Sequence, residues 1–249
     1  MKTISKVFSC ILAFSSLLGS VEGQNRYKIW YDKPASYWEE ALPIGNGRIA
    51  AMVFGDPQLE QIQLNEETVS AGSPYQNYNE EAKAALPEMR RLIFEGKYEE
   101  AQNMAATKIL SQVGNEMPYQ TVGRLNIRYQ DHKKVSNYYR DLDISNAMTV
   151  TRYKVDGVEF TEETFASFTD QLVIRHIKSS KPGAINCELF FNTPMRDPKR
   201  SIYGKKGLRL EGITHGSRYF PGKVHYCADL DVKNKGGEVT MANDTLDRK

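Results

Sequence analysis

The sequence has little of what several enzyme classes must display. It holds three cysteines and four histidines in 249 residues, and no histidines follow a metal-ligand spacing such as HExxH, so no zinc site is predicted. The Gly-x-Ser-x-Gly pattern of α/β-hydrolases and the GxxxxGK[ST] pattern of phosphate-binding loops do not occur. Because the formal net charge is only +2 and both signs are interspersed, nothing indicates binding to nucleic acid or to an acidic membrane.

Long apolar runs are also scarce, and the main one stands at the start of the chain. Lys2 and Lys6 precede an apolar stretch over residues 7–18, and small residues follow up to Gly23. This order of basic start, apolar middle and small-residue exit is typical of a secretory signal, and the stretch is shorter than the roughly 20 residues that a membrane span needs. We predict that residues 1–23 are a signal peptide and that the exported protein is periplasmic or extracellular.

Two cysteines, Cys187 and Cys227, follow the predicted signal. An exported protein can pair two thiols, but a single pair in a domain of this size is not a disulfide framework. Cys227 alternates with apolar neighbours and is predicted to face outward, whereas Cys187 is predicted to face the core. The pattern favours separate thiols and leaves a disulfide open.

Most of the remaining chain has the alternating pattern of short β-strands. Strands are predicted at residues 26–31, 59–64, 125–129, 148–155, 158–166, 171–177, 185–191, 207–213 and 224–232. Residues 41–55 are predicted to form a hairpin with Gly45-Asn46-Gly47 at its tip, because glycine and asparagine tolerate positive φ. Asp156-Gly157 is the strongest short hairpin signal.

A helical hairpin is predicted between the third strand and the fourth. Its two helices are residues 79–95 and 98–110, which carry apolar side chains at three- and four-residue spacing. Asn77 or Asn79 is available as an N-cap. Pro87 is predicted to kink the first helix or to move its start, and Gly96 to close it.

These elements predict a mainly β fold, a large antiparallel β-sandwich with an inserted helical hairpin at about residues 79–110. Turn signals recur about every 10 to 15 residues, which is typical of such a sandwich. After the turn at residues 235–237, residues 238–241 begin another strand that has little room left. We therefore expect residues 24–249 to form one sandwich domain that is incomplete at its C-terminal end, as in a truncated chain.

The segment of residues 64–75 differs from the other connections. It gathers amide, carboxylate, hydroxyl and aromatic groups between a strand and a helix. Such groups suit the hydroxyls of a sugar, but they also suit a well-capped connection with no ligand. The residues alone favour the second interpretation.

Four segments in a fixed order are more specific than any single motif. They are residues 42–55 (LPIGNGRIAAMVFG), 62–68 (IQLNEET) with Gly72-Ser73-Pro74, 139–144 (YRDLDI) and 165–173 (FASFTDQLV). Together they resemble the opening of glycoside hydrolase family 95, the α-L-fucosidases and related α-L-galactosidases. The similarity runs from about Tyr27 to the C-terminus. Ser70 and Ser73 depart from the family, which usually has tryptophan and glycine there.

The resemblance implies a supporting sandwich that precedes a catalytic (α/α)6 barrel. In that family the barrel carries the catalytic residues, inverts the anomeric centre and releases terminal α-L-fucose, so no catalytic residue is carried over to this chain. No cofactor is implied, and the implied partners are a fucosylated glycan bound through the barrel and a downstream catalytic polypeptide. Residues expected to face the barrel or the mouth of its site are Asn46, Arg48, Asn65, Glu66 and Thr68.

The acidic pairs of this chain do not match the chemistry of glycoside hydrolysis. That reaction needs two carboxyl groups facing one sugar across roughly 5 to 9.5 Å. Glu66-Glu67 and Glu162-Glu163 are adjacent, and neighbours on a strand point to opposite faces. We predict that neither pair converges on one site and that the chain alone is inactive.

Two further interpretations remain. A stand-alone carbohydrate-binding module needs an exposed aromatic platform, for which the candidates are Trp30, Trp38, Tyr75 and Tyr78. A remnant of a split or frameshifted gene needs no site at all. The apparent lack of a finished last strand counts against the binding module.

Overall fold

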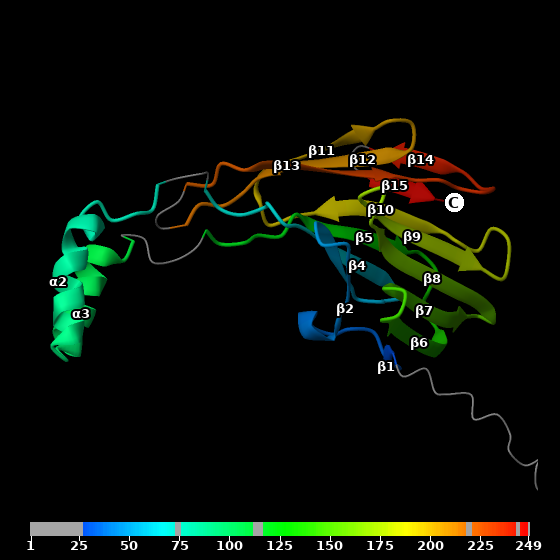
Figure 1. The fold of residues 1–249 in the computed structure, drawn as a ribbon. Helices are drawn as coiled ribbons and strands as arrows, with labels where there is room; N and C mark the ends of the chain where they lie inside the picture. The colour runs from blue at the N-terminus through cyan, green and yellow to red at the C-terminus, as the bar shows by residue number, and fades with distance from the viewer. Residues whose placement is uncertain (1–26, 73–75, 112–116, 218–220, 243–244, 249) are drawn as a thin grey trace, which may run out of the picture.

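The chain folds as a β-sandwich from which a helical hairpin projects (Figure 1). The computed structural model describes residues 27–72, 76–111, 117–217, 221–242 and 245–248. The predicted signal peptide, residues 1–23, lies outside these ranges. The paired strands of the three sheets are all antiparallel, so the predicted fold class is confirmed.

One layer of the sandwich is a seven-stranded sheet. Its strand order is β14-β15-β10-β5-β4-β3-β2. The strands are β2 (Leu42–Gly45), β3 (Ile49–Val53), β4 (Leu59–Glu66), β5 (Gly123–Tyr129), β10 (Cys187–Asn192), β14 (Val239–Ala242) and β15 (Thr245–Arg248). The predicted hairpin at residues 41–55 is therefore confirmed as β2 and β3.

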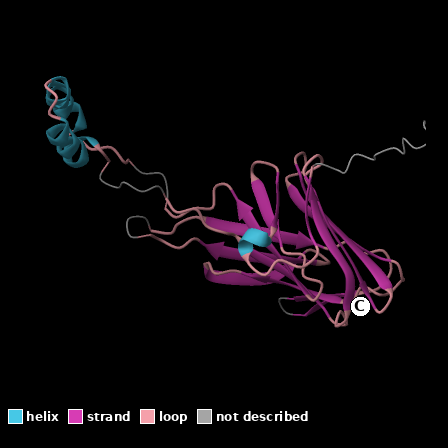
Figure 2. Cartoon of the chain, turned by 90° about the horizontal axis from the view of Figure 1, so that it is seen from below, coloured by secondary structure: helices cyan, strands magenta, loops and turns pink. Residues whose placement is uncertain are grey.

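The opposite layer consists of two smaller sheets (Figure 2). The five-stranded sheet has the order β1-β6-β7-β8-β9, and the three-stranded sheet has the order β11-β12-β13. Their strands are β1 (Lys28–Tyr31), β6 (Val135–Asp143), β7 (Met148–Val155), β8 (Val158–Ser167), β9 (Leu172–Ser179), β11 (Arg196–Tyr203), β12 (Gly207–Ile213) and β13 (His225–Asp231).

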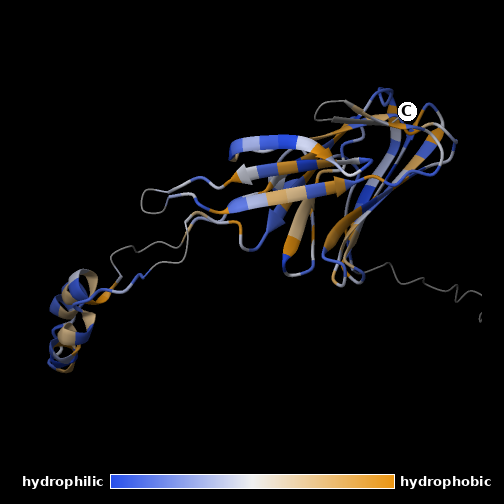
Figure 3. Ribbon diagram, turned by 90° about the horizontal axis from the view of Figure 1, so that it is seen from above, coloured by the Kyte–Doolittle hydropathy of each residue, from blue (hydrophilic) through white to orange (hydrophobic). Residues whose placement is uncertain are grey.

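The alternation of side chains along the strands builds one large apolar core. Ile62 of β4, Ile127 of β5 and Leu208 of β12 are each 1% exposed and belong to the same cluster, and Figure 3 shows the alternating hydropathy along the strands. Burying a side chain of this size contributes about 1.5–3 kcal/mol. A smaller cluster forms around Tyr153 and Phe160 at the β7–β8 hairpin.

The cysteines lie where the alternation placed them. Cys187 is buried on β10, Cys227 is exposed on β13, and no disulfide joins them. On β13, Tyr226, Ala228 and Leu230 pack against the large core, which confirms the inward face predicted for that strand.

The helical hairpin is confirmed, with shorter helices than predicted. The elements are α2 (Ala82–Phe94), α3 (Tyr98–Met104) and a π-helical turn, η2 (Ala105–Ile109). Asn79 precedes α2 and its Oδ1 accepts the N–H of Glu81 at 3.0 Å, and Gly96 ends the helix with φ +77°. Pro87 lies inside α2. In the described ranges, no helix is both long and apolar enough to cross a membrane.

Three strands, β6, β11 and β15, were not predicted. β6 contains a bulge between Ser136 and Tyr139, β11 is exposed along its whole length, and β15 lies in the last residues of the chain. The final predicted strand is β14. It pairs with β15, which in turn pairs with β10, so the segment that was expected to have little room forms a hairpin on the large sheet.

Two glycines with positive φ offer a matched test of the packing. Gly47 has φ +96° and open space around an added Cβ, whereas at Gly55, with φ +76°, a Cβ would lie 2.7 Å from the Tyr138 hydroxyl and 2.9 Å from Arg140 Cδ. We expect Gly47→Ala to cost about 1 kcal/mol through backbone strain. Gly55→Ala should cost about 3 kcal/mol or more, because the side chains must also move. Urea unfolding of both variants checks this, and equal costs would contradict the packing at Gly55.

Candidate functional site

The tip of the β2–β3 hairpin is closed by the side chain of Asn46. Its Oδ1 accepts the backbone N–H of Arg48 at 3.1 Å and of Ile49 at 2.9 Å. Its Nδ2 donates to the carbonyl of Ser167 at 2.8 Å, which ties the tip to the end of β8. Asn46 therefore fixes where the tip lies and which way Arg48 leaves it.

Hydrogen bonds connect Arg48, Glu66 and Thr68 beside this tip. We call these three residues and Asn46 the hairpin cluster. Arg48 Nε donates to Glu66 Oε1 at 3.0 Å. Glu66 Oε2 accepts the Thr68 N–H at 2.8 Å and its hydroxyl at 2.5 Å. Partial burial opposes the charge, but these donors hold the pKa of Glu66 below its usual value. The carboxylate is thus an ionised acceptor, and Arg48 remains 59% exposed.

Asn65 is the fifth predicted site residue, and it points away from the hairpin cluster. It is paired with Ala50 on β3, while Glu66 is paired with Ile49, and adjacent residues of a strand face opposite sides of the sheet. Its Oδ1 is buried and has no hydrogen-bond partner among the described residues. Four of the five predicted residues therefore meet in the hairpin cluster and Asn65 is separate, and the expectation that they face a barrel or the mouth of its site stays a prediction.

A shallow depression of about 270 Å³ lies between the ends of β4, β5 and β10. Arg124, which lines it, donates from Nη1 to Gln61 Oε1 at 2.6 Å. The residues that line it are Gln63, Thr121, Gly123, Arg124, Asn192, Thr193 and Pro194. Its polar lining comes from β4, β5, β10 and the residues that flank them, and it was not predicted as a site.

The adjacent acids of β8 separate as predicted. Glu163 lies on the outer face, where Lys178 Nζ is 3.0 Å from its Oε2 and His176 Nδ1 is 3.4 Å from the same atom. Glu162 points into the sandwich with a side chain that is 2% exposed. The pair does not converge on one site, because consecutive side chains alternate across the sheet.

Two acids do converge in a buried group that was not predicted from the sequence. Glu60 of β4 and Glu162 of β8 both contact Arg175 of β9, and we call the three residues the acid–arginine cluster. Arg175 Nη2 is 2.7 Å from Glu60 Oε2 and also donates to Glu162 Oε2. The side chains of Glu60 and Arg175 are 0% and 7% exposed. The available signal was the position of Glu60 and Glu162 on the apolar side of their strands.

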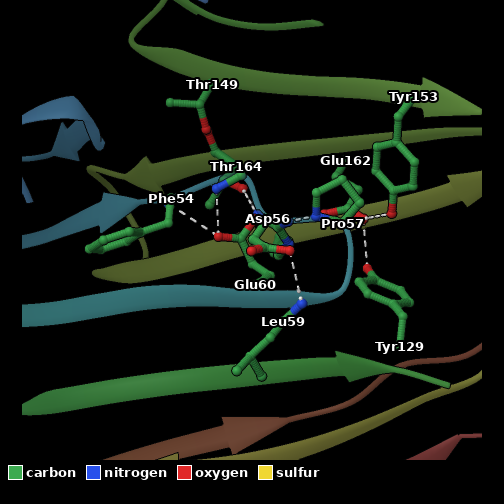
Figure 4. Close-up of polar contacts among 12 residues, drawn as sticks. Phe54, Asp56, Pro57, Leu59, Glu60, Tyr129, Thr149, Tyr153, Glu162 and Thr164 are labelled. Carbon is green, nitrogen blue, oxygen red and sulfur yellow. Dashed lines mark hydrogen bonds and ion pairs between the residues drawn. The ribbon is translucent and has the colours of Figure 1, made fainter. Parts of the chain in front are cut away.

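Hydroxyl and backbone donors surround the same acids (Figure 4). Tyr129 and Tyr153 donate to Glu162 Oε1 at 2.7 and 2.6 Å. The N–H groups of Phe54 and Gly55 donate to Glu60 Oε1 at 3.1 and 2.8 Å. Each carboxylate oxygen therefore has a donor, as a buried charge requires.

Burial dominates the titration of this group. It raises the pKa of Glu60 to about 7, against the opposing effects of Arg175 and of the Gly55 N–H. Burial and the charge of Glu162 also raise the pKa of Tyr129 well above its usual value. Arg175 supplies one positive charge to the two acids. Because this charge can compensate only one carboxylate, the cluster favours the state in which one of the two carboxyl groups keeps its proton.

The acid–arginine cluster has the residue types of a hydrolytic site but not its access. Hydrolysis needs a sugar and a water between the two acids, whereas here Arg175 fills the space between Glu60 and Glu162 and all three side chains are at most 7% exposed. Among the residues that the structure describes, no group of three His, Cys, Asp or Glu side chains is placed to hold a metal ion. The cluster is built to join β4, β8 and β9.

The chain is similar to known glycoside hydrolases over much of its length. Residues 29–248 match the model of the family described as Glycosyl hydrolase family 65, N-terminal domain. Alpha-L-fucosidase 2 of Arabidopsis thaliana is 37% identical over 171 residues, which are 68% of this chain and 20% of the relative. Two proteins described as Probable alpha-fucosidase A are each 26% identical: that of Aspergillus niger over 61% of this chain and 20% of the relative, and that of Aspergillus oryzae over 66% and 23%.

The chain thus spans about a fifth of the length of the curated relatives that it matches. The resemblance to α-L-fucosidases that the four ordered segments indicated is confirmed by these relatives. The match to the family model covers most of the chain and includes strands of all three sheets. This chain belongs to the family described as Glycosyl hydrolase family 65, N-terminal domain, and it is an N-terminal domain related to α-fucosidases.

Proposed function

We propose that this chain is the supporting domain of an exported glycoside hydrolase that releases terminal α-L-fucosyl residues from glycans. The names of its relatives support the substrate class, and the family supports the placement of the domain ahead of the hydrolytic part. Export is supported by the signal-like order of residues 1–23. The hydrolytic groups then come from polypeptide outside this sequence.

The observation that carries the proposal is the closure of the acid–arginine cluster. Its two carboxyl groups converge as catalytic acids do. Their oxygens, however, already accept hydrogen bonds from Arg175 and from the donors around them. A sugar would have to displace an arginine that is 7% exposed. The cluster therefore supports a structural role for these acids.

The hairpin cluster supports a role in contacting the hydrolytic part. Asn46 and Glu66 fix the position of Arg48, and its guanidinium stays largely exposed at the end of the sandwich. A fixed, exposed arginine suits a carboxylate or carbonyl on a neighbouring domain. Asn65 and the depression near Arg124 lie on the other face of the sheet and are assigned no part in this contact.

The purified chain should not hydrolyse 2′-fucosyllactose, because it provides no accessible pair of acids for the reaction. Release of fucose is measured with the Arabidopsis relative as a positive control and heat-unfolded chain as a blank. Turnover that co-purifies with the folded chain would contradict the proposal that hydrolysis needs other polypeptide.

A further inference from the structure

We propose that the outer face of the five-stranded sheet carries a carbohydrate-binding platform of its own, formed by Trp30 and Tyr139 with Lys28 and Arg152 beside them. This inference goes beyond a supporting role, because it places a glycan on this chain rather than on the hydrolytic part. It also differs from the hairpin cluster in location, since that cluster lies at the β2–β3 tip of the other sheet.

The strand register brings the two aromatic rings to one face. Trp30 of β1 is paired with Asp141 of β6, and Tyr139 lies two residues before Asp141 on the same side of that strand. The bulge between Ser136 and Tyr139 sets the side on which Tyr139 emerges. The ring centroids are 6.2 Å apart with an interplanar angle of 20°, so the rings lie nearly parallel.

The indole of Trp30 is open to solvent. Trp30 is 60% exposed although it stands on a sheet face and beside another ring. A single exposed aromatic side chain is ordinary on a protein surface, and what distinguishes Trp30 is the second ring stacked beside it at 6.2 Å. A nearly parallel pair with most of one ring free offers a flat apolar surface of limited size.

A buried carboxylate fixes the polar groups around these rings. The side chain of Asp141 is 0% exposed, although its strand position faces outward. Its Oδ1 accepts from Lys28 Nζ at 3.2 Å, and its Oδ2 lies 3.8 Å from Arg152 Nη1 and has no hydrogen-bond partner among the described residues. Asp141 thus holds both cations next to the rings.

Lys28 and Arg152 keep donors that point to solvent. Their side chains are 25% and 51% exposed, and Asp141 satisfies only part of their hydrogen-bonding capacity. Burial, followed by the nearby charge of Asp141, raises the pKa of Tyr139, so its hydroxyl stays a neutral donor and acceptor. The rings are therefore bordered by groups that suit hydroxyl oxygens.

These features fit a neutral sugar ring better than other ligands. The C–H face of a pyranose packs on the electron-rich face of an aromatic ring, while its hydroxyls accept from lysine and arginine. The buried negative charge of Asp141 offsets one of the two positive charges of Lys28 and Arg152, which weakens attraction to phosphate groups. An apolar partner would leave the donors of Arg152 without acceptors.

The chain contains two tryptophans, which gives a direct binding assay with a matched control. Trp38 belongs to a short 3-10 helix, η1 (Trp38–Glu40), and is 50% exposed. In Trp38→Phe the remaining indole is Trp30, so its fluorescence reports on the platform. Titration with 2′-fucosyllactose and with cellotetraose should give a saturable change for at least one of them, matched by calorimetry on the unmodified chain.

Trp30→Ala should weaken that binding by about tenfold or more, while Trp38→Ala should leave it within about twofold. If circular dichroism shows that Trp30→Ala does not fold, Trp30→Phe and Arg152→Gln take its place, with an expected loss of about three- to tenfold. Absence of saturable binding to both sugars, or equal losses in the Trp30 and Trp38 variants, would overturn the proposal.

Discussion

Replacing Arg175 with methionine should destabilise the domain by about 3–5 kcal/mol or prevent it from folding. Methionine keeps much of the length and volume of the side chain but removes the cation that Glu60 and Glu162 share. Two carboxyl groups then face each other in the core, where leaving one charge uncompensated already carries a large free-energy cost. Urea unfolding, followed by circular dichroism, measures the change.

Arg209 offers a matched control on the surface. It makes a bidentate contact with Asp229, with Nε–Oδ1 and Nη2–Oδ2 distances of 2.6 and 2.7 Å, and its side chain is 36% exposed. Arg209→Met should cost about 1 kcal/mol or less, because water screens an exposed pair. If Arg175→Met costs no more than this control, the acid–arginine cluster does not hold the two layers together.

A second substitution separates lost charge from lost packing. Adding Glu60→Gln to Arg175→Met removes one of the two stranded carboxyl groups and should restore part of the stability. A double variant that is no more stable than Arg175→Met alone would attribute the loss to packing around the arginine.

The sandwich was predictable because its strands repeat a simple rule. Alternation located nine of the strands, including β13 with its inward Tyr226 and Leu230, and the Asp156-Gly157 turn located the β7–β8 hairpin. β11 was missed because all its side chains are exposed, and β6 was missed because its bulge breaks the alternation. The alternation of apolar and polar residues does not identify a strand that is exposed along its whole length or whose register is shifted by a bulge.

The sites were less predictable because they depend on which strands become neighbours. Glu60 and Arg175 are 115 residues apart along the chain, yet they meet across the sandwich, and no local pattern specifies that contact. Trp30 was recognised as an aromatic candidate, whereas its partner Tyr139 follows a bulge and was not. Asn46 and Arg48 were named because the hairpin segment that carries them resembles the opening of the α-L-fucosidases, and their part in a contact with a barrel stays a prediction.

The contribution of Glu60 to the stability of the domain should fall as the pH rises from about 4.5 to about 7. Its pKa in the folded chain is about 7, against an ordinary value of 4.5, so the folded state holds a proton that the unfolded state has released across this range. Stability contributed by a raised pKa is present below the unfolded value and is lost as the pH rises through the folded value. A shift of this size corresponds to about 3 kcal/mol.

Several other groups face Glu60, and the design must separate them. Glu162 and Arg175 contact the same site, with the hydroxyls of Tyr129 and Tyr153 beyond them. His132 acts with the opposite sign: burial lowers its pKa, so its contribution to stability falls as the pH drops below about 6.5.

Glu60→Gln isolates the effect, because the variant keeps these neighbours and cannot titrate at residue 60. Urea unfolding at pH 5, 6, 7 and 8 gives the difference in unfolding free energy between the original chain and the variant. As the pH rises, the original chain should lose about 3 kcal/mol of stability relative to the variant. A constant difference would mean that Arg175 and the N–H groups of Phe54 and Gly55 lower the pKa of Glu60 as much as burial raises it. Glu60 would then be ionised in the folded domain throughout this pH range.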